Sequence, residues 1–189
     1  MFLQVFRGEV DDPPAARDCL ERWTHTLGTG WLGTTAGVTD DGHSMTLVRF
    51  GSADAAASTP ARDVWWSEMS ALSPEALTVR DCPEVMTQLR GDAADAGFVQ
   101  VLQGRITSLD RLQRTLGASS AWQATARPDI IGGLLGLHGD GRFTQVVYFT
   151  SEDHARAGEP GPVESPGAEP LVEDLTWFDL RTPWAYAPR

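Results

Sequence analysis

Apolar and polar residues alternate in two stretches of the chain, and these two stretches resemble each other. Residues 2–10 read FLQVFRGEV and residues 98–106 read FVQVLQGRI. At an offset of 96 residues, Phe, Gln, Val and Gly coincide at positions 2/98, 4/100, 5/101 and 8/104. Alternation of this kind predicts a β-strand. Two copies of one strand, about half a chain apart, indicate two copies of one folding unit.

Helical and strand periodicities alternate through the first half. Apolar residues at steps of three and four form one stripe along residues 13–27, which predicts an amphipathic helix. Two apolar runs flank Asp40-Asp41-Gly42, which predicts a hairpin. The expected elements are a strand over 2–10, a helix over 13–27, strands over 31–38 and 45–50, a helical turn over 53–57, a helix over 60–72, and a closing strand over 77–79 that residues 85–89 extend.

The same order restarts in the second half, where the hairpin aligns with the first at an offset of 99 residues. Glycine and proline interrupt residues 156–170, which excludes a long helix there. The expected elements are a strand over 98–106, a helix from Thr107 or Ser108 to about 119, hairpin strands over 130–137 and 143–149 around Gly139-Asp140-Gly141, a short helix, a closing strand over 175–180, and a tail with Trp184 and Tyr186 that docks onto the body.

The predicted fold class is α+β: two ferredoxin-like βαββαβ repeats packed as an intramolecular dimeric α/β barrel. The predicted division is a first repeat over residues 1–90, a linker over 91–96, and a second repeat over 97–189 that carries an acidic Pro/Gly loop over 156–174. This order resembles the dimeric α/β-barrel superfamily, which includes antibiotic-biosynthesis monooxygenases and stress-responsive barrel proteins. The resemblance covers roughly residues 2–90 and 97–184.

The resemblance implies a protein that binds a small hydrophobic or aromatic compound, extending to a cofactor-independent monooxygenase-like enzyme. The pocket in such members lies between sheet and helices and is lined with aromatic residues. The alternative is a non-catalytic protein-interaction or stress-response barrel, whose acidic loop contacts another protein. Haem-degrading members use an Asn, Trp and His set, which this chain cannot complete because it has no Asn.

Seven residues are the candidate ligand-binding set, and no catalytic residue is identified: Gln4, Trp23, Trp31, Trp65, Trp66, Glu68 and Gln100. The tryptophans could form a wall for a planar ligand, or they could fill the core. Glu68 would act as a base if it faced an apolar cavity, and would otherwise be solvated. The two glutamines occupy matching strand positions, either as pocket contacts or as structural amides.

The histidines are candidates for a haem ligand by residue type alone: His25, His43, His138 and His154. His43 and His138 lie beside the two hairpin turns, so both are expected to face water. No metal site is predicted, because Cys19 and Cys82 are the only thiols and no histidine has ligand spacing beside them. The sequence therefore predicts no cofactor.

The charge limits the partners. The 189-residue chain has a formal net charge of −11, with 15 basic residues that are all Arg. Such a surface repels nucleic acid and anionic membranes. The absence of lysine excludes a Schiff-base mechanism, and no stretch approaches the apolar length of a membrane span or a secretory leader. A cytoplasmic location is expected, with further homo-oligomerisation of the pseudo-dimer left open.

Overall fold

A computed structural model describes residues 1–59, 62–89, 91–112, 114, 127–158 and 170–188. The elements, in chain order, are β1 (Phe2–Glu9), α1 (Pro13–Thr24), β2 (Trp31–Val38), β3 (His43–Phe50), α2 (Ala53–Ala57), α3 (Arg62–Ala71), β4 (Thr78–Cys82), β5 (Glu84–Leu89), η1 (Ala93–Asp95), β6 (Phe98–Ile106), β7 (Ile130–Leu137), β8 (Arg142–Phe149), α5 (Glu152–Ala157), β9 (Val172–Leu180) and β10 (Trp184–Tyr186). None of the helices in these ranges is long and apolar enough to cross a bilayer.

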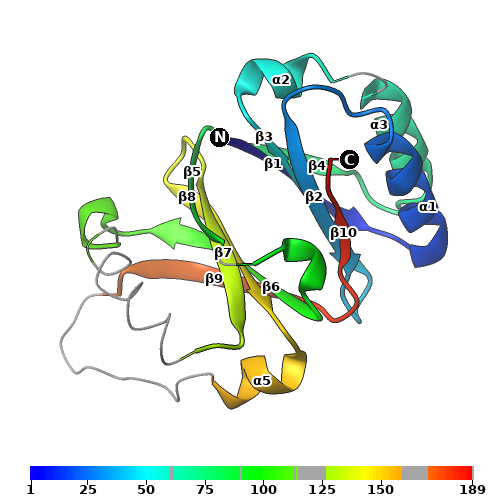
Figure 1. Cartoon of the computed structure of the whole chain (residues 1–189). Helices are drawn as coiled ribbons and strands as arrows, with labels where there is room; N and C mark the ends of the chain where they lie inside the picture. The colour runs from blue at the N-terminus through cyan, green and yellow to red at the C-terminus, as the bar shows by residue number, and fades with distance from the viewer. Residues whose placement is uncertain (60–61, 90, 113, 115–126, 159–169, 189) are drawn as a thin grey trace.

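The strands form two antiparallel five-stranded sheets, which confirms the α+β class (Figure 1). Sheet A has the order β10-β2-β3-β1-β4, and sheet B has the order β5-β7-β8-β6-β9. Both sheets are open, so they do not close into the one barrel that the sequence pattern predicts. A tandem duplication and the division into 1–90, 91–96 and 97–189 remain predictions.

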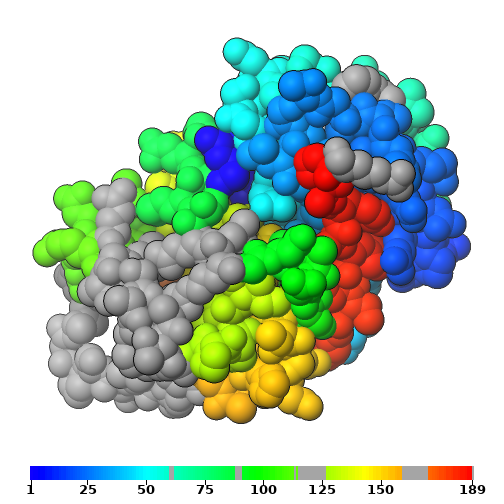
Figure 2. Space-filling model, viewed as in Figure 1, coloured from blue at the N-terminus to red at the C-terminus, as the bar shows by residue number. Residues whose placement is uncertain are grey.

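Each half of the chain contributes one strand to the sheet of the other half. β5 follows β4 directly but pairs with β7 in sheet B, from Glu84 opposite Leu137 to Leu89 opposite Gly132. Residues 85–89 therefore do not extend the closing strand of sheet A, contrary to the sequence prediction. β10 makes the reciprocal crossing and pairs with β2, and Figure 2 shows this red segment against the blue N-terminal elements. The tail thus docks as expected, and it does so as an edge strand.

The two hairpins form where the Asp-Gly turns predicted them. Gly42 and Gly141 have φ angles of 85° and 79°, in the left-handed region that glycine adopts without steric cost. The short helices that follow each hairpin begin at matching caps. The Ser52 hydroxyl accepts from the amide of Ala55, and the Ser151 hydroxyl accepts from the amide of His154. The predicted helix after Ser108 is helical over 109–112, and most of its remainder lies outside the described residues.

An outer layer of helices covers sheet A on the side away from sheet B (Figure 1). α1 begins at Asp12, whose carboxylate accepts from the amide of Ala15, and two prolines occupy its first turn. Its buried stripe packs with α3 against β1, β2 and β3 in one cluster: Phe2, Phe6, Val10, Ala16, Cys19, Leu20, Trp23, Ala36, Val48, Phe50, Ala56, Trp65 and Met69.

The inner layer lies between the two sheets and draws on both. Its buried residues are Leu3, Val5, Met45, Leu47, Cys82, Ala93, Val99, Val101, Leu134, Val146, Tyr148, Phe178 and Leu180. Two glycines make the close approach possible. A Cβ at Gly37 would lie 3.2 Å from Leu180 of the opposite sheet, and one at Gly136 would lie 2.8 Å from Cys82 Sγ and 3.0 Å from Leu3 Cδ2.

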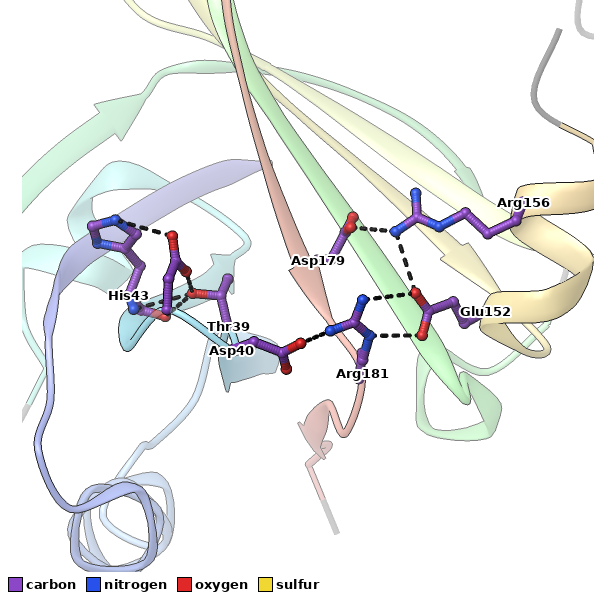
Figure 3. A network of polar contacts seen from close by, with 8 residues as sticks. Thr39, Asp40, His43, Glu152, Arg156, Asp179 and Arg181 are labelled. Carbon is purple, nitrogen blue, oxygen red and sulfur yellow. Dashed lines mark hydrogen bonds and ion pairs between the residues drawn. The ribbon is translucent and has the colours of Figure 1, made fainter. Parts of the chain in front are cut away.

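An ion-pair network joins the β2–β3 turn of sheet A to sheet B (Figure 3). Arg181 bonds Glu152 through two nitrogens, at 2.7 and 3.1 Å, and also pairs with Asp40 in the turn. Arg156 adds contacts to Glu152 and Asp179. The Asp40 and Arg181 side chains are 73% and 45% exposed, so this ion pair contributes little to stability.

Replacing Gly136 with Ala tests the inter-sheet packing. The new methyl group would meet the side chains of Cys82 and Leu3 inside a filled core, so we expect a loss of about 1–3 kcal/mol in the free energy of unfolding. Gly139→Ala is the matched control, because nothing lies within 4 Å of its Cβ position. Urea denaturation of both variants measures the difference, and equal stabilities would contradict the packing described here.

Candidate binding cleft

A cleft of about 320 Å³ opens between the two sheets, at the end toward which β1 and β6 run. We call it the inter-sheet cleft. Sheet A and the loop before β4 supply Val5, Arg7, Gly8, Glu9, His43, Glu75, Ala76, Thr78 and Arg80; sheet B and the β7–β8 turn supply Gln103, Gly104, Arg105, His138, Arg142, Phe143, Asp174 and Thr176.

The cleft arises from a change of polarity along the inner faces of the sheets. On β1, the inward positions begin with Leu3 and Val5, both buried, and continue with Arg7 in the cleft wall. On β6, the inward Val99 and Val101 are followed by Gln103. Since alternate residues of a strand share a face, each strand carries an apolar floor and a polar wall on the same side.

Four arginines line the cleft, and three of them have carboxylate partners. Arg105 lies 2.5 Å from Glu173 and 3.5 Å from Asp174. Arg80 and Arg142 approach the carboxylate of Asp140 at 3.5 and 3.7 Å. The amide of Arg142 donates to Asp140 and, with the nearby Arg80 charge, lowers the pKa of that carboxyl.

The fourth arginine, Arg7, is held by an aromatic ring. Its guanidinium carbon lies 4.7 Å from the ring centroid of Phe178, which is 2% exposed. This is cation–π geometry. Within the described residues, Arg7 has no carboxylate at ion-pair distance. One guanidinium in the wall of the cleft is thus positioned but not neutralised.

His138 lies at the inner end of the cleft and is 8% exposed, so the expectation that it faces water was wrong. Its Nε2 lies 3.0 Å from the hydroxyl of Thr144, and its Nδ1 lies 3.6 Å from Cys82 Sγ. Gln103 donates to the same hydroxyl at 3.1 Å. Burial, followed by the charge of Arg80, lowers the pKa of His138 and keeps the ring neutral.

The thiol beside His138 is not an activated nucleophile. Burial, helped by the charge of Asp81, raises the pKa of Cys82 to about 12, and the side chain is 0% exposed. A reactive cysteine needs a lowered pKa and access to solvent. Cys82 and His138 are therefore a packed pair rather than a catalytic dyad.

His43 occupies the opposite wall and is partly accessible, with 29% of its side chain exposed. Its Nδ1 lies 3.5 Å from Glu9 and its Nε2 lies 3.6 Å from Asp41. The ring also meets Phe178 edge-on, at 6.1 Å between centroids. His43 and Glu9 are thus a histidine–carboxylate pair facing the cleft.

The tryptophans of the predicted ligand set lie elsewhere. Trp23 and Trp65 stack at 4.3 Å and are 3% and 2% exposed, with Phe6 edge-on to both, so they fill the layer between sheet A and its helices. Trp66 packs beside them and borders a surface hollow. Trp31 donates to Thr34 and borders a different hollow beneath β10. The structure brings Trp23, Trp65 and Trp66 into ring contact, whereas Trp31 packs against another part of the same hydrophobic cluster.

The polar members of that set all have structural partners. Gln4 donates to Asp81 at 2.9 Å on the neighbouring strand, and Gln100 donates to Asp179 at 3.2 Å in the matching position of sheet B. Glu68 pairs with Arg22 at 2.8 Å. The bond from Arg22, then that from Cys19, lowers the pKa of Glu68, the opposite of the shift that a buried base would show.

Sequence reasoning missed the cleft because its residues come from strands far apart in the chain. The one available signal was local: Arg7 follows Val5 on the inward face of β1, and Gln103 follows Val101 on that of β6. No group of three or more His, Cys, Asp or Glu side chains that could hold a metal occurs in the described ranges.

No family model and no curated protein matches the chain. Solved structures with a similar fold include a candidate monooxygenase from Fusobacterium nucleatum subsp. nucleatum, with a TM-score of 0.75 at 11% identity over 98% of this chain and 94% of that one. A candidate monooxygenase from Lactobacillus acidophilus gives 0.70 at 12% identity over 98% of each chain. An anthrone oxidase-like protein gives 0.65 at 12% identity, over 98% of this chain and 92% of that one. At these identities the similarity shows the fold alone.

Truncation of Trp65 measures how far the aromatic cluster is core. Trp65→Ala removes a ring that is 2% exposed and stacked on Trp23, so we expect a loss of about 3–5 kcal/mol in the free energy of unfolding. Trp177→Ala, at a position that is 55% exposed, should cost far less. A Trp65 variant as stable as the Trp177 variant would show that the cluster does not support the fold.

His138 should give stability a defined pH dependence. Its pKa is lowered in the folded state, so between that value and the unfolded value of about 6.5 the unfolded chain binds more protons. Stability is therefore lost as the pH falls below about 6.5, and His138→Gln should reduce this loss. Urea midpoints between pH 8 and pH 5 measure it, with the exposed His25→Gln as control. Equal pH slopes for parent and His138→Gln would contradict the assignment.

Proposed function

We propose that the protein binds a small organic molecule in the inter-sheet cleft. The observation that carries this proposal is a cleft of about 320 Å³ with an apolar floor and polar walls. Its size falls at the lower end of ligand pockets, in which polar groups fix the orientation of the ligand. Its lining is mostly charged or polar, with apolar surface from Val5, Ala76 and Phe143. Arg7, Gln103 and His43 are such groups, and they converge from both sheets.

The fold supports the same proposal at a coarser level. Two structures of the same fold are candidate monooxygenases, and a third is an anthrone oxidase-like protein. We extend the proposal to a monooxygenase-like oxidation of the bound molecule without a cofactor. In the balanced reaction, a methylene group of the substrate and one molecule of dioxygen give a carbonyl group and one molecule of water. The two C–H bonds that break supply the electrons and the two protons of the water, and the second oxygen atom enters the product.

Such an oxidation begins with removal of a proton from the substrate carbon. His43, beside Glu9 on the cleft wall, is the group suited to accept it, because its ring is partly accessible. His138 is unsuited, because it is 8% exposed and lies within the core, whereas 29% of the His43 side chain is exposed. Oxygen uptake with anthrone, measured above its uncatalysed oxidation in parent and His43→Gln, tests this extension without bearing on binding itself.

Filling the cleft tests the binding proposal. Thr176→Trp would place a large ring in the cleft wall, whereas Ser58→Trp adds the same ring at an exposed site at the end of α2. With 1-naphthol, 1-naphthoate and 1-naphthamide as probes, we expect at least one compound to raise the melting temperature of the parent and of Ser58→Trp but not of Thr176→Trp. No response in the parent, or an unchanged response in Thr176→Trp, would overturn the proposal.

A non-catalytic interaction protein is the second candidate, and one observation favours it. Leu175 and Trp177 are 42% and 55% exposed on β9, an edge strand of sheet B. Exposed aromatic residues are enriched at protein interfaces. The acidic loop that the sequence assigned to this role lies mostly outside the described residues.

A further inference from the structure

We propose that the ligand of the inter-sheet cleft is a planar organic monocarboxylate and that Arg7 anchors its carboxylate. This inference rests on the proposed binding function and names the class of molecule bound.

Arginines and carboxylates are nearly balanced in the cleft, unlike in the chain as a whole. The whole chain has 26 acidic residues and 15 arginines. The cleft lining has four arginines and three carboxylates, which belong to Glu9, Glu75 and Asp174, and Asp140 and Glu173 pair with three of these arginines from beside it. The preference for an anion therefore depends on the one arginine that has no carboxylate partner among the described residues.

The pairing of these charges singles out one arginine. Arg105 faces Glu173 and Asp174, and the guanidinium groups of Arg80 and Arg142 both approach Asp140. Glu9 faces His43. Arg7 is left with the ring of Phe178 and no carboxylate partner among the described residues.

The geometry of Arg7 suits a carboxylate. Its guanidinium lies over a fully buried ring, which fixes the side chain without using its hydrogen-bonding edge in an ion pair. A guanidinium fork matches a carboxylate with two parallel N–H···O bonds. The side chain thus loses little further conformational freedom when such a ligand binds.

Because only one arginine of the cleft lacks a carboxylate partner among the described residues, we expect the ligand to have a single negative charge. One unneutralised guanidinium can compensate one negative charge, and a second would face Glu75 and Asp174 in the same lining. The apolar floor, which includes Val5 and Phe143, favours a hydrocarbon body attached to the carboxylate. An aromatic monocarboxylate meets both requirements, whereas inorganic phosphate has no hydrocarbon body.

Calorimetric titration with 1-naphthoate and its neutral analogue 1-naphthamide tests the inference in parent, Arg7→Gln and Arg22→Gln. Arg22→Gln is the charge-matched control, since Arg22 lies on α1 outside the cleft, with its side chain 65% exposed. We expect the parent to bind naphthoate at least tenfold more tightly than naphthamide. Arg7→Gln should lose tenfold or more in affinity for naphthoate and keep its affinity for naphthamide, and Arg22→Gln should match the parent.

The outcomes separate the two proposals. Equal affinities for both compounds, or undiminished naphthoate binding in Arg7→Gln, would overturn the carboxylate inference and leave the binding function standing. Failure of the parent to bind 1-naphthoate would overturn the carboxylate inference, and failure to bind 1-naphthol, 1-naphthoate or 1-naphthamide would overturn both. If Arg7→Gln does not fold, Arg7→Lys replaces it: this variant keeps the charge but not the two-bond fork, and a naphthoate affinity equal to that of the parent would count against Arg7 as the anchor.

Discussion

The inner faces of two open sheets must cover each other, and the rest of the structure depends on this contact. Helices occupy the outer side of sheet A, so its inner residues, such as Leu3 and Leu47, are removed from water mainly by sheet B. The approach is close enough that β2 and β7 carry glycine where they meet Leu180 and Cys82. The exchange of β5 and β10 then joins each half of the chain to the other half's sheet by backbone hydrogen bonds.

The paired strand glutamines carry the same chemistry in both sheets, whereas the charged and polar positions of the cleft do not. The Gln4–Asp81 bond has its counterpart in Gln100–Asp179, at the same place in the strand register. In the cleft, the matching register positions on β1 and β6 hold Arg7 and Gln103, which line opposite walls. The two sheets therefore share a similar backbone arrangement but place different side chains in the cleft. Two walls of different chemistry orient a small ligand in one direction.

Much of the secondary structure could be predicted, because local chemistry determines it. The Asp-Gly turns predict both hairpins, and the apolar stripe along α1 predicts which face of this helix is buried. The sheet that β5 joins could not be predicted, because alternation along a strand does not identify its neighbour. His138 was misjudged for a related reason: its place beside a turn suggested exposure, but Cys82, which buries it, is 56 residues away. The cleft likewise depends on contacts between strands that are far apart in the chain.

The filled sheet–helix layer explains why the candidate site lies between the sheets. The resemblance placed a pocket against the helices, yet Trp23, Trp65 and Phe6 occupy that space in ring-to-ring contact. A stack of this kind leaves no room for a planar ligand without repacking the core. The inner faces, by contrast, turn from apolar to charged before the sheets end, as Val5 gives way to Arg7. Because charged side chains need water or a partner, the sheets cannot pack tightly there, and a cleft is the physical result.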